Sequence, residues 1–169
     1  RAIDRGKQIH DEIINRRLLD KNIVLGNALV DMYAKCGVLT KARQVLEELP
    51  VRDVVSWTAL MVAFTEYEHG EEAFDCFDRM QCEGVCPNNV TFVCVLKACS
   101  STGNIDKGEV IHAQVERQGL VKGDIFIGST LVDMYSKCHS LMEAHHVFVR
   151  LSYRTVVSWT ALISGYVEN

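Results

Sequence analysis

The feature that most constrains this chain is an internal repeat with an offset of 102 residues. Residues 27–64 align with residues 129–166 without a gap, and 19 of the 38 aligned positions are identical. The stretches LVDMY, KC and VVSWTAL occur in both copies, and in the first copy they begin at Leu29, Lys35 and Val54. A repeat of this strength takes precedence over any single motif, because tandem repeats fold by stacking similar units.

The offset is itself made of smaller units. Apolar faces with the spacing small-x-x-apolar-apolar-x-x-apolar begin at Gly6, Ala42, Ala73, Gly108 and Ala144. The last four faces are 31, 35 and 36 residues apart, and these distances together make up the offset of 102. Apolar residues at i, i+3, i+4 and i+7 share one face of an α-helix. The sequence therefore predicts three kinds of helical unit in a fixed order that restarts.

Each unit is expected to contain two helices. The first carries apolar residues such as Leu29 and Tyr33, a break follows, and the second carries the face described above. One such hairpin cannot cover its own apolar face, so neighbouring units must stack. The prediction is an all-α fold, a right-handed α-solenoid of tandem helix-turn-helix repeats. The breaks are expected at Gly37, Gly70, Gly103 and Ser140, and the N-caps of first helices at Ser56, Thr91 and Ser158.

Composition narrows the class further. The chain has 169 residues and is 48% hydrophobic, but no apolar run approaches the roughly 20 residues of a membrane span. Arg1 opens the chain and no signal or transit peptide follows it, so we expect a piece of a longer protein. The net charge of −4 does not favour a nucleic-acid partner, although binding depends on the charge of one face. The seven cysteines lack metal-ligand spacing and are expected to be buried thiols, with no metal and no cofactor.

The motifs now identify a family resemblance that covers the whole chain. NALVDMYAKCG from Asn27, VVSWTALM from Val54 and GVCPN from Gly84 resemble the consensus of the pentatricopeptide repeat proteins. The alternation of unit lengths resembles the plant subclass that cycles through long, short and standard units. In that register the chain divides into a partial long unit 1–22, a short unit 23–53, a standard unit 54–88, a long unit 89–124, a second short unit 125–155 and a partial standard unit 156–169.

The resemblance implies binding of single-stranded RNA, with one base for each unit and the 5′ end toward the N-terminal units. In the family the fifth and last residues of a unit choose the base, and the second residue packs on it. Carried over, the base-reading positions are Asn27 with Asp53, Thr58 with Asn88, Val93 with Asp124, Ser129 with Thr155, and Thr160. The base-stacking positions are Val24, Val55, Val90, Phe126 and Val157. Lys35 and Lys137 are candidates for contacts with phosphates.

The chemistry of these positions differs from unit to unit. Asparagine, threonine and serine carry donors and acceptors that can face a base edge. Val93 forms no hydrogen bond, so the long unit 89–124 is expected to read nothing or to read weakly. The pair of Ser129 with Thr155 departs from the family's common pairs, which leaves the base at that unit open.

Each of these residues also has a simpler interpretation. Asn27, Thr58 and Ser129 are polar residues of a kind common near helix starts, and the two lysines could be solvated surface groups. The remaining repeated aromatic and histidine residues are expected in the core or between helices: Trp57, Trp159, Tyr33, Tyr135, His10 and His112.

No catalytic set is found. His10-Asp11-Glu12 has the H-x-E form of zinc deaminases but lacks a downstream P-C-x-x-C, so it is interpreted as chance. The chain is therefore not expected to be an enzyme.

The resemblance implies a role in guiding organellar RNA processing, with cytidine-to-uridine editing as the expected process and a mitochondrion or a chloroplast as the location. The alternative is a protein-interaction α-solenoid, because concave helical faces also suit peptides. Accessory editing proteins could bind through the long units. No membrane is expected to be a partner, and self-association is expected through the cut terminal units.

Overall fold

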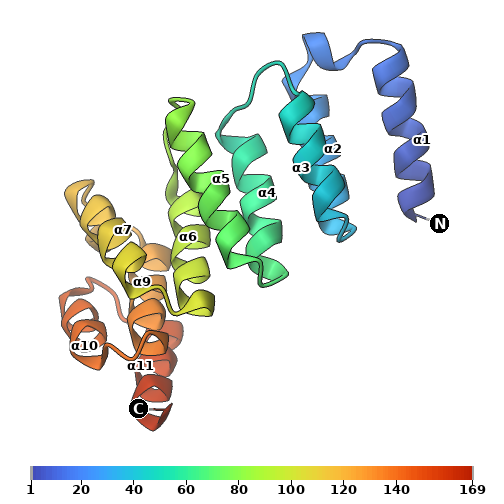
Figure 1. Ribbon diagram of the computed structural model, residues 1–169. Helices are drawn as coiled ribbons and strands as arrows, with labels where there is room; N and C mark the ends of the chain where they lie inside the picture. The colour runs from blue at the N-terminus through green and yellow to red at the C-terminus, as the bar shows by residue number, and fades with distance from the viewer. Residues whose placement is uncertain (1, 169) are drawn as a thin grey trace. The chain divides into compact units, whose positions relative to one another are not determined.

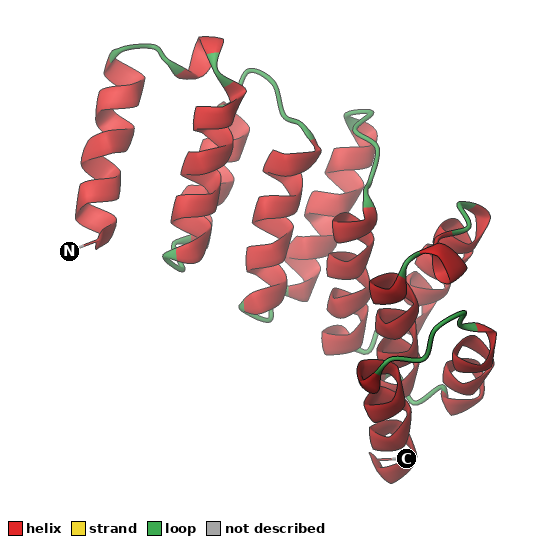
Figure 2. Cartoon of the chain, turned by 180° about the vertical axis from the view of Figure 1, so that it is seen from behind, coloured by secondary structure: helices red, strands yellow, loops and turns green. Residues whose placement is uncertain are grey.

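The computed structural model describes residues 2–168, without the side chains of Ala2 and Lys21. Every regular element in this range is a helix, as Figure 2 shows, so the all-α prediction is confirmed. The chain forms two compact units, of which the first ends at Cys86 and the second begins at Pro87. Among the described residues, no helix combines the length and the apolar character that a membrane crossing requires.

The unit that ends at Cys86 consists of two helical hairpins and a preceding helix. Helices α2 and α4 lie side by side, α3 packs on α2, and α5 packs on α4 (Figure 1). Their shared faces bury the apolar residues that carry the sequence repeat, such as Val30, Val45 and Trp57. The elements are α1 (Ala2–Asn15), the 3-10 turn η1 (Leu19–Lys21), α2 (Ile23–Lys35), α3 (Leu39–Glu48), α4 (Val54–Glu66) and α5 (Gly70–Cys82).

The unit that begins at Pro87 follows the same plan. Helices α6, α9 and α11 lie next to one another in that order, while α7 packs on α6 and α10 packs on α9. Its fully buried residues include Phe92, Ile111 and Leu131. The elements are α6 (Asn89–Thr102), α7 (Ile105–Arg117), the short α8 (Leu120–Gly123), α9 (Ile125–Lys137), α10 (Leu141–Arg150) and α11 (Val156–Glu168).

The first helices begin three residues earlier than the expected N-caps allow. Ser56 is the third residue of α4 and is fully buried, and Asp53 is the N-cap, accepting a hydrogen bond of 2.9 Å from the Ser56 backbone N–H. Asn88 caps α6 in the same way, and the Thr155 hydroxyl accepts from the backbone N–H of Ser158 at 3.1 Å. The prediction of Ser56, Thr91 and Ser158 as N-caps was therefore wrong. These hydroxyls instead complete the cap from inside the helix, as the Ser56 and Thr91 side chains do in two capping boxes.

The breaks within hairpins occur at residues with a left-handed backbone. Gly37 and Gly103 have φ angles of 73° and 69°, as the sequence predicts for glycine at a helix end. Ser140 lies in the connection between α9 and α10 as expected, whereas Gly70 is already the first residue of α5, so the break before α5 comes earlier than expected. The left-handed residues there are Glu68 and His139, with φ angles of 60° and 59°.

Two expectations about burial need correction. Trp57 is fully buried, but Trp159 is half exposed, because no helix among the described residues covers α11 as α5 covers α4. Cys76, Cys94 and Cys99 are buried as expected, and burial raises the pKa of the Cys76 and Cys99 thiols to about 11 and about 12. Three cysteines at helix ends or in connections are exposed instead: Cys36, Cys82 and Cys86.

Candidate nucleic-acid interface

An apolar side chain stands exposed at the same place in every first helix. It belongs to the second residue of the helix, next to the N-cap and away from the buried face. The five side chains are the expected base-stacking residues, and their exposed fractions are 69% for Val24, 53% for Val55, 52% for Val90, 77% for Phe126 and 64% for Val157. Apolar exposure that recurs at one register position is typical of a surface that contacts a ligand.

Asn27 and Asp53 are in direct contact. The amide Nδ2 of Asn27 donates to both carboxylate oxygens of Asp53, at 3.2 Å and 3.4 Å. Because a carboxylate only accepts hydrogen bonds, the amide nitrogen must face it and the amide oxygen must point away. That oxygen is buried and has no hydrogen-bond partner among the described residues. The pair thus holds an unsatisfied acceptor one helical turn from the exposed Val24, and a ligand N–H that reached this buried oxygen could satisfy it.

Ser129 and Thr155 are also in contact, with 3.1 Å between their hydroxyl oxygens. The Thr155 oxygen accepts in addition from the backbone N–H of Ser158, because Thr155 directly precedes α11. The structure therefore brings together the fifth and last residues of both short units. In each case the last residue caps the next first helix and is held at that helix's N-terminus.

The long unit is arranged differently. Val93 is half buried and makes no contact with Asp124 through a polar group. Asp124 instead accepts a hydrogen bond of 2.7 Å from the Nδ2 of Asn89, the first residue of α6. Asn89 was missed by the sequence analysis. The signal that could have found it is its polarity, since the other first helices begin with isoleucine or valine.

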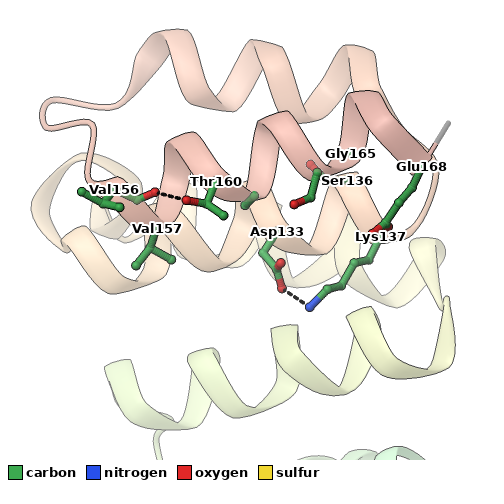
Figure 3. A pocket seen from close by; sticks show the side chains of 10 residues that line it. Asp133, Ser136, Lys137, Val156, Val157, Thr160, Gly165 and Glu168 are labelled. Atoms are coloured by element: carbon green, nitrogen blue, oxygen red, sulfur yellow. Dashed lines mark hydrogen bonds and ion pairs between the residues drawn. The ribbon is translucent and has the colours of Figure 1, made fainter.

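The two threonines at fifth positions use their hydroxyls locally. Thr58 donates to the backbone oxygen of Val54 at 2.6 Å, and Thr160 donates to that of Val156 at 2.8 Å (Figure 3). Each hydroxyl proton is thus engaged within its helix, and the oxygen keeps acceptor capacity. Thr58 and Asn88 belong to one repeat but to different compact units of the fold. Thr58 lies in the compact unit that ends at Cys86, whereas the side chain of Asn88 caps α6 in the compact unit that begins at Pro87.

A groove of about 410 Å³ lies between α9 and α11 (Figure 3). Val157 and Thr160 line one side of it, and Lys137 lines the other. Lys137 donates to Asp133 at 2.9 Å, and the equivalent Lys35 donates to Asp31 at 2.8 Å. The hydrogen bond that Lys35 donates to Asp31 raises the pKa of the Lys35 ammonium above its ordinary value. Both lysines are charged and exposed, but each already has a carboxylate partner one helical turn away.

Comparisons with known proteins identify the family of the chain. The sequence profile of the PPR repeat family matches residues 52–101, and that of the single PPR repeat matches residues 27–54 and 157–169. The chain belongs to the pentatricopeptide repeat (PPR) family. The family resemblance of the motifs is thereby confirmed.

Curated PPR proteins of Arabidopsis thaliana match nearly the whole chain. Pentatricopeptide repeat-containing protein At3g09040, mitochondrial, is 41% identical over 99% of the chain, and At4g18520, chloroplastic, is 38% identical over 98%. The chain spans 16% and 26% of the lengths of these two relatives. The names of the relatives confirm the expected organellar location, in a mitochondrion or a chloroplast.

Solved PPR structures have the same fold. The crystal structure of PPR10 in complex with an 18-nt psaJ RNA element superposes with a TM-score of 0.78 at 20% identity, covering 99% of the chain and 26% of that protein. PPR10 from maize superposes with a TM-score of 0.74 at 18% identity, covering 96% of the chain and 24% of that protein. The prediction of a helical-repeat fold is therefore confirmed.

Proposed function

We propose that this PPR chain is a single-stranded RNA-binding module, without enzymatic activity, in which each unit contacts one base. The observation that carries the proposal is the polar pair of Asn27 with Asp53, which holds an unsatisfied acceptor one helical turn from the exposed Val24. PPR10, which has the same fold, was crystallised in complex with an RNA element, and this supports the proposal.

The finer assignment follows the unit lengths. We propose membership of the subclass with long, short and standard units, divided at residues 22, 53, 88, 124 and 155. Helices α2, α4, α6, α9 and α11 each begin one residue after such a division, which supports this register. In this assignment the chain guides organellar RNA processing, with cytidine-to-uridine editing as the process.

The proposed order of bases starts from the two pairs with common partners. In the family's pairing, asparagine with aspartate goes with uracil, so Asn27 with Asp53 reads U. Threonine with asparagine goes with adenine, so Thr58 with Asn88 reads A. The units are consecutive, and the expected core is 5′-UA-3′. Ser129 with Thr155 is expected to favour a purine, less strongly.

Asn88→Asp is the variant that tests this order. It should move the second preference from A toward G, because an acceptor-only carboxylate replaces an amide. Aspartate caps a helix as well as asparagine does, so α6 should keep its start. The assay is competition among short RNAs that differ at one base, where a mispaired base should cost on the order of 1 kcal/mol. An unchanged preference for A over G would contradict the register or the RNA-reading role.

Affinity and its salt dependence provide a second test. Four complete units contact about four bases, and each stacked base contributes only about 1–3 kcal/mol before ordering costs. Binding is therefore weak and should weaken further as salt rises, because phosphate contacts release counterions. Lys35→Ala and Lys137→Ala should reduce this salt dependence if the lysines leave their aspartates for phosphates. No binding to any RNA pool at low salt would rule the proposal out.

Partners other than RNA are also proposed. Accessory editing proteins would bind through the long units 1–22 and 89–124. Self-association would involve exposed apolar side chains of the terminal helices, such as Ile9 on α1 and Ile163 on α11. Light scattering at high concentration should then detect species above the monomer.

A protein-interaction solenoid is the second candidate function. The observation that favours it is the charge of the groove side: Lys35 and Lys137 are paired with Asp31 and Asp133, and the whole chain carries a net charge of −4. Titration with labelled RNAs and with a peptide library separates the two functions. Saturable binding of peptides alone would favour this candidate.

A further inference from the structure

In the long unit 89–124 the residue types at the first and fifth positions of the first helix are exchanged relative to the other units. Units that begin at Ile23, Val54, Ile125 and Val156 have an aliphatic first residue and a polar fifth residue. In α6 the first residue is Asn89 and the fifth is Val93. Residues four apart lie on the same face of an α-helix, one turn from each other. The polar group has therefore moved by one turn along the face that carries the base-reading positions.

The contacts of Asn89 repeat those of Asn27. Asn89 Nδ2 donates to Asp124 Oδ2 at 2.7 Å, as Asn27 Nδ2 donates to Asp53 at 3.2 Å. Both aspartates are last residues of their units and cap the next first helix through Oδ1. Asp53 accepts there from one backbone N–H, and Asp124 accepts from the backbone N–H groups of Phe126 and Ile127 at 2.8 Å and 2.9 Å. In both cases the carboxylate that caps one first helix also accepts a hydrogen bond from a side-chain amide of the preceding first helix.

The polar atoms of Asn89 that remain are suited to a base edge. Because the carboxylate takes one N–H, the amide oxygen of Asn89 points elsewhere as an acceptor beside the second N–H donor. The side chain is exposed, and the next residue, Val90, is one of the exposed apolar residues at second positions. Phe126 stands at the second position of the following first helix and is 77% exposed. A base held between Val90 and Phe126 would meet the amide of Asn89 at its edge.

We propose that Asn89 and Asp124 form the base-reading pair of the unit 89–124, and that this pair selects uracil. The inference rests on the proposed RNA-binding function. Uracil follows because the donors and acceptors match those of Asn27 with Asp53, and the ring N–H of uracil lies between two carbonyl groups that an amide can face. The expected core becomes 5′-UAU-3′, in place of a third base that is read weakly or not at all through Val93.

The alternative role of Asn89 is purely structural. The hydrogen bond to Asp124 also ties the start of α6 to the start of α9, and its loss would lower stability whether or not RNA binds. A structural tie has no reason to distinguish bases, so the base preference at the third position separates the two roles, and the affinity alone does not.

The experiment measures competition among labelled RNAs of the form 5′-UAN-3′ in a constant flank, at low salt, with the 169-residue chain. The wild type should prefer U at N by about fivefold, the ratio that corresponds to one hydrogen bond of typical net strength. Asn89→Val gives α6 the aliphatic first residue of the other units and should abolish this preference. Asn89→Val with Val93→Asn returns the amide to the fifth position and should restore it.

Asn27→Val is the matched control, read with RNAs that vary at the first base. If Asn27→Val abolishes the first preference and Asn89→Val leaves the third unchanged, the inference is wrong and RNA reading by the chain stands. If neither preference exists in the wild type, the proposed function fails and the inference fails with it. Thermal melting by circular dichroism checks that the variants are folded, and a loss of melting temperature with an unchanged third-base profile would assign Asn89 the structural role.

Discussion

The short units 23–53 and 125–155 share their packing and differ in their polar pairs. A Cβ on Gly26 would lie 2.4 Å from Leu49 Cδ2, and a Cβ on Gly128 would lie 2.6 Å from Leu151 Cδ2. A larger residue at either position would have to displace the leucine that packs on the glycine. Such backbone-to-leucine contacts hold the two helices of a unit in one geometry.

The contacts to the preceding long units are also repeated. His10 Nδ1 lies 3.0 Å from the Tyr33 hydroxyl, and His112 Nδ1 lies 2.9 Å from that of Tyr135. The polar pairs at the candidate interface are different, since one unit has an amide with a carboxylate and the other has two hydroxyls. The comparison teaches that the packing between helices and the polar pairs that we propose for base choice reside in separate residues. One packing scheme can therefore present different polar groups at the same place.

The largest expected effect concerns the shared packing. Leu29→Ala and Leu131→Ala should each lower the free energy of unfolding by about 2–5 kcal/mol, because each leaves a cavity in a buried face. Chemical denaturation measures both, with Met142→Ala as an exposed control that should change stability little. If one leucine variant loses stability in this range and the other loses almost none, the two units are not equivalent in their packing.

A smaller effect should separate the two histidine–tyrosine contacts. Tyr33→Phe removes the partner of His10, which is 2% exposed, and should cost about 1–3 kcal/mol, the penalty for an unsatisfied buried group. Tyr135→Phe should cost less, because His112 is only half buried and water can replace the hydroxyl. Denaturation of the two variants side by side gives the measurement. Equal costs would mean that burial does not set the strength of this contact.

Exchange of the polar pairs should transfer base preference with an effect on the order of 1 kcal/mol. Ser129→Asn with Thr155→Asp should give the unit 125–155 the uracil preference expected for the unit 23–53. The reverse exchange, Asn27→Ser with Asp53→Thr, should remove that preference from the first unit. Both are read by RNA competition at the corresponding base. Stability should change little, because aspartate and threonine both serve as N-caps.

The smallest expected effect is a dependence of stability on pH. Burial lowers the pKa of His10 and His112 in the folded chain below the ordinary value of 6.5. The unfolded chain then binds protons more readily, so stability is full above pH 6.5 and is lost as the pH falls from there toward the folded pKa. Thermal melts of the wild type at neutral and mildly acidic pH should show this loss. His10→Phe with His112→Phe should flatten the dependence, and an unchanged slope would assign it to other groups.

The sequence alone determined the repeat, the two helices per unit and the all-α fold. Apolar spacing and the offset of 102 are enough for this, because within each compact unit a helix packs mainly on helices close to it in the sequence. The resemblance to the PPR family, set in the same register, picked out the exposed second residues and the pairs Asn27 with Asp53 and Ser129 with Thr155. Their contact follows from the way in which consecutive first helices lie side by side.

Only the tertiary structure decided how the polar groups are shared. The cap of α4 is Asp53, which serves Ser56 and Asn27 together, and sequence spacing does not show which of several oxygens takes a given N–H. The contact of Asn89 with Asp124 joins residues 35 positions apart, and it depends on where the short α8 sets the start of α9. Hydrogen bonds depend on ångström-scale distances between helices, whereas apolar faces need only the right period, and for this reason the fold could be predicted where the contact of Asn89 with Asp124 could not.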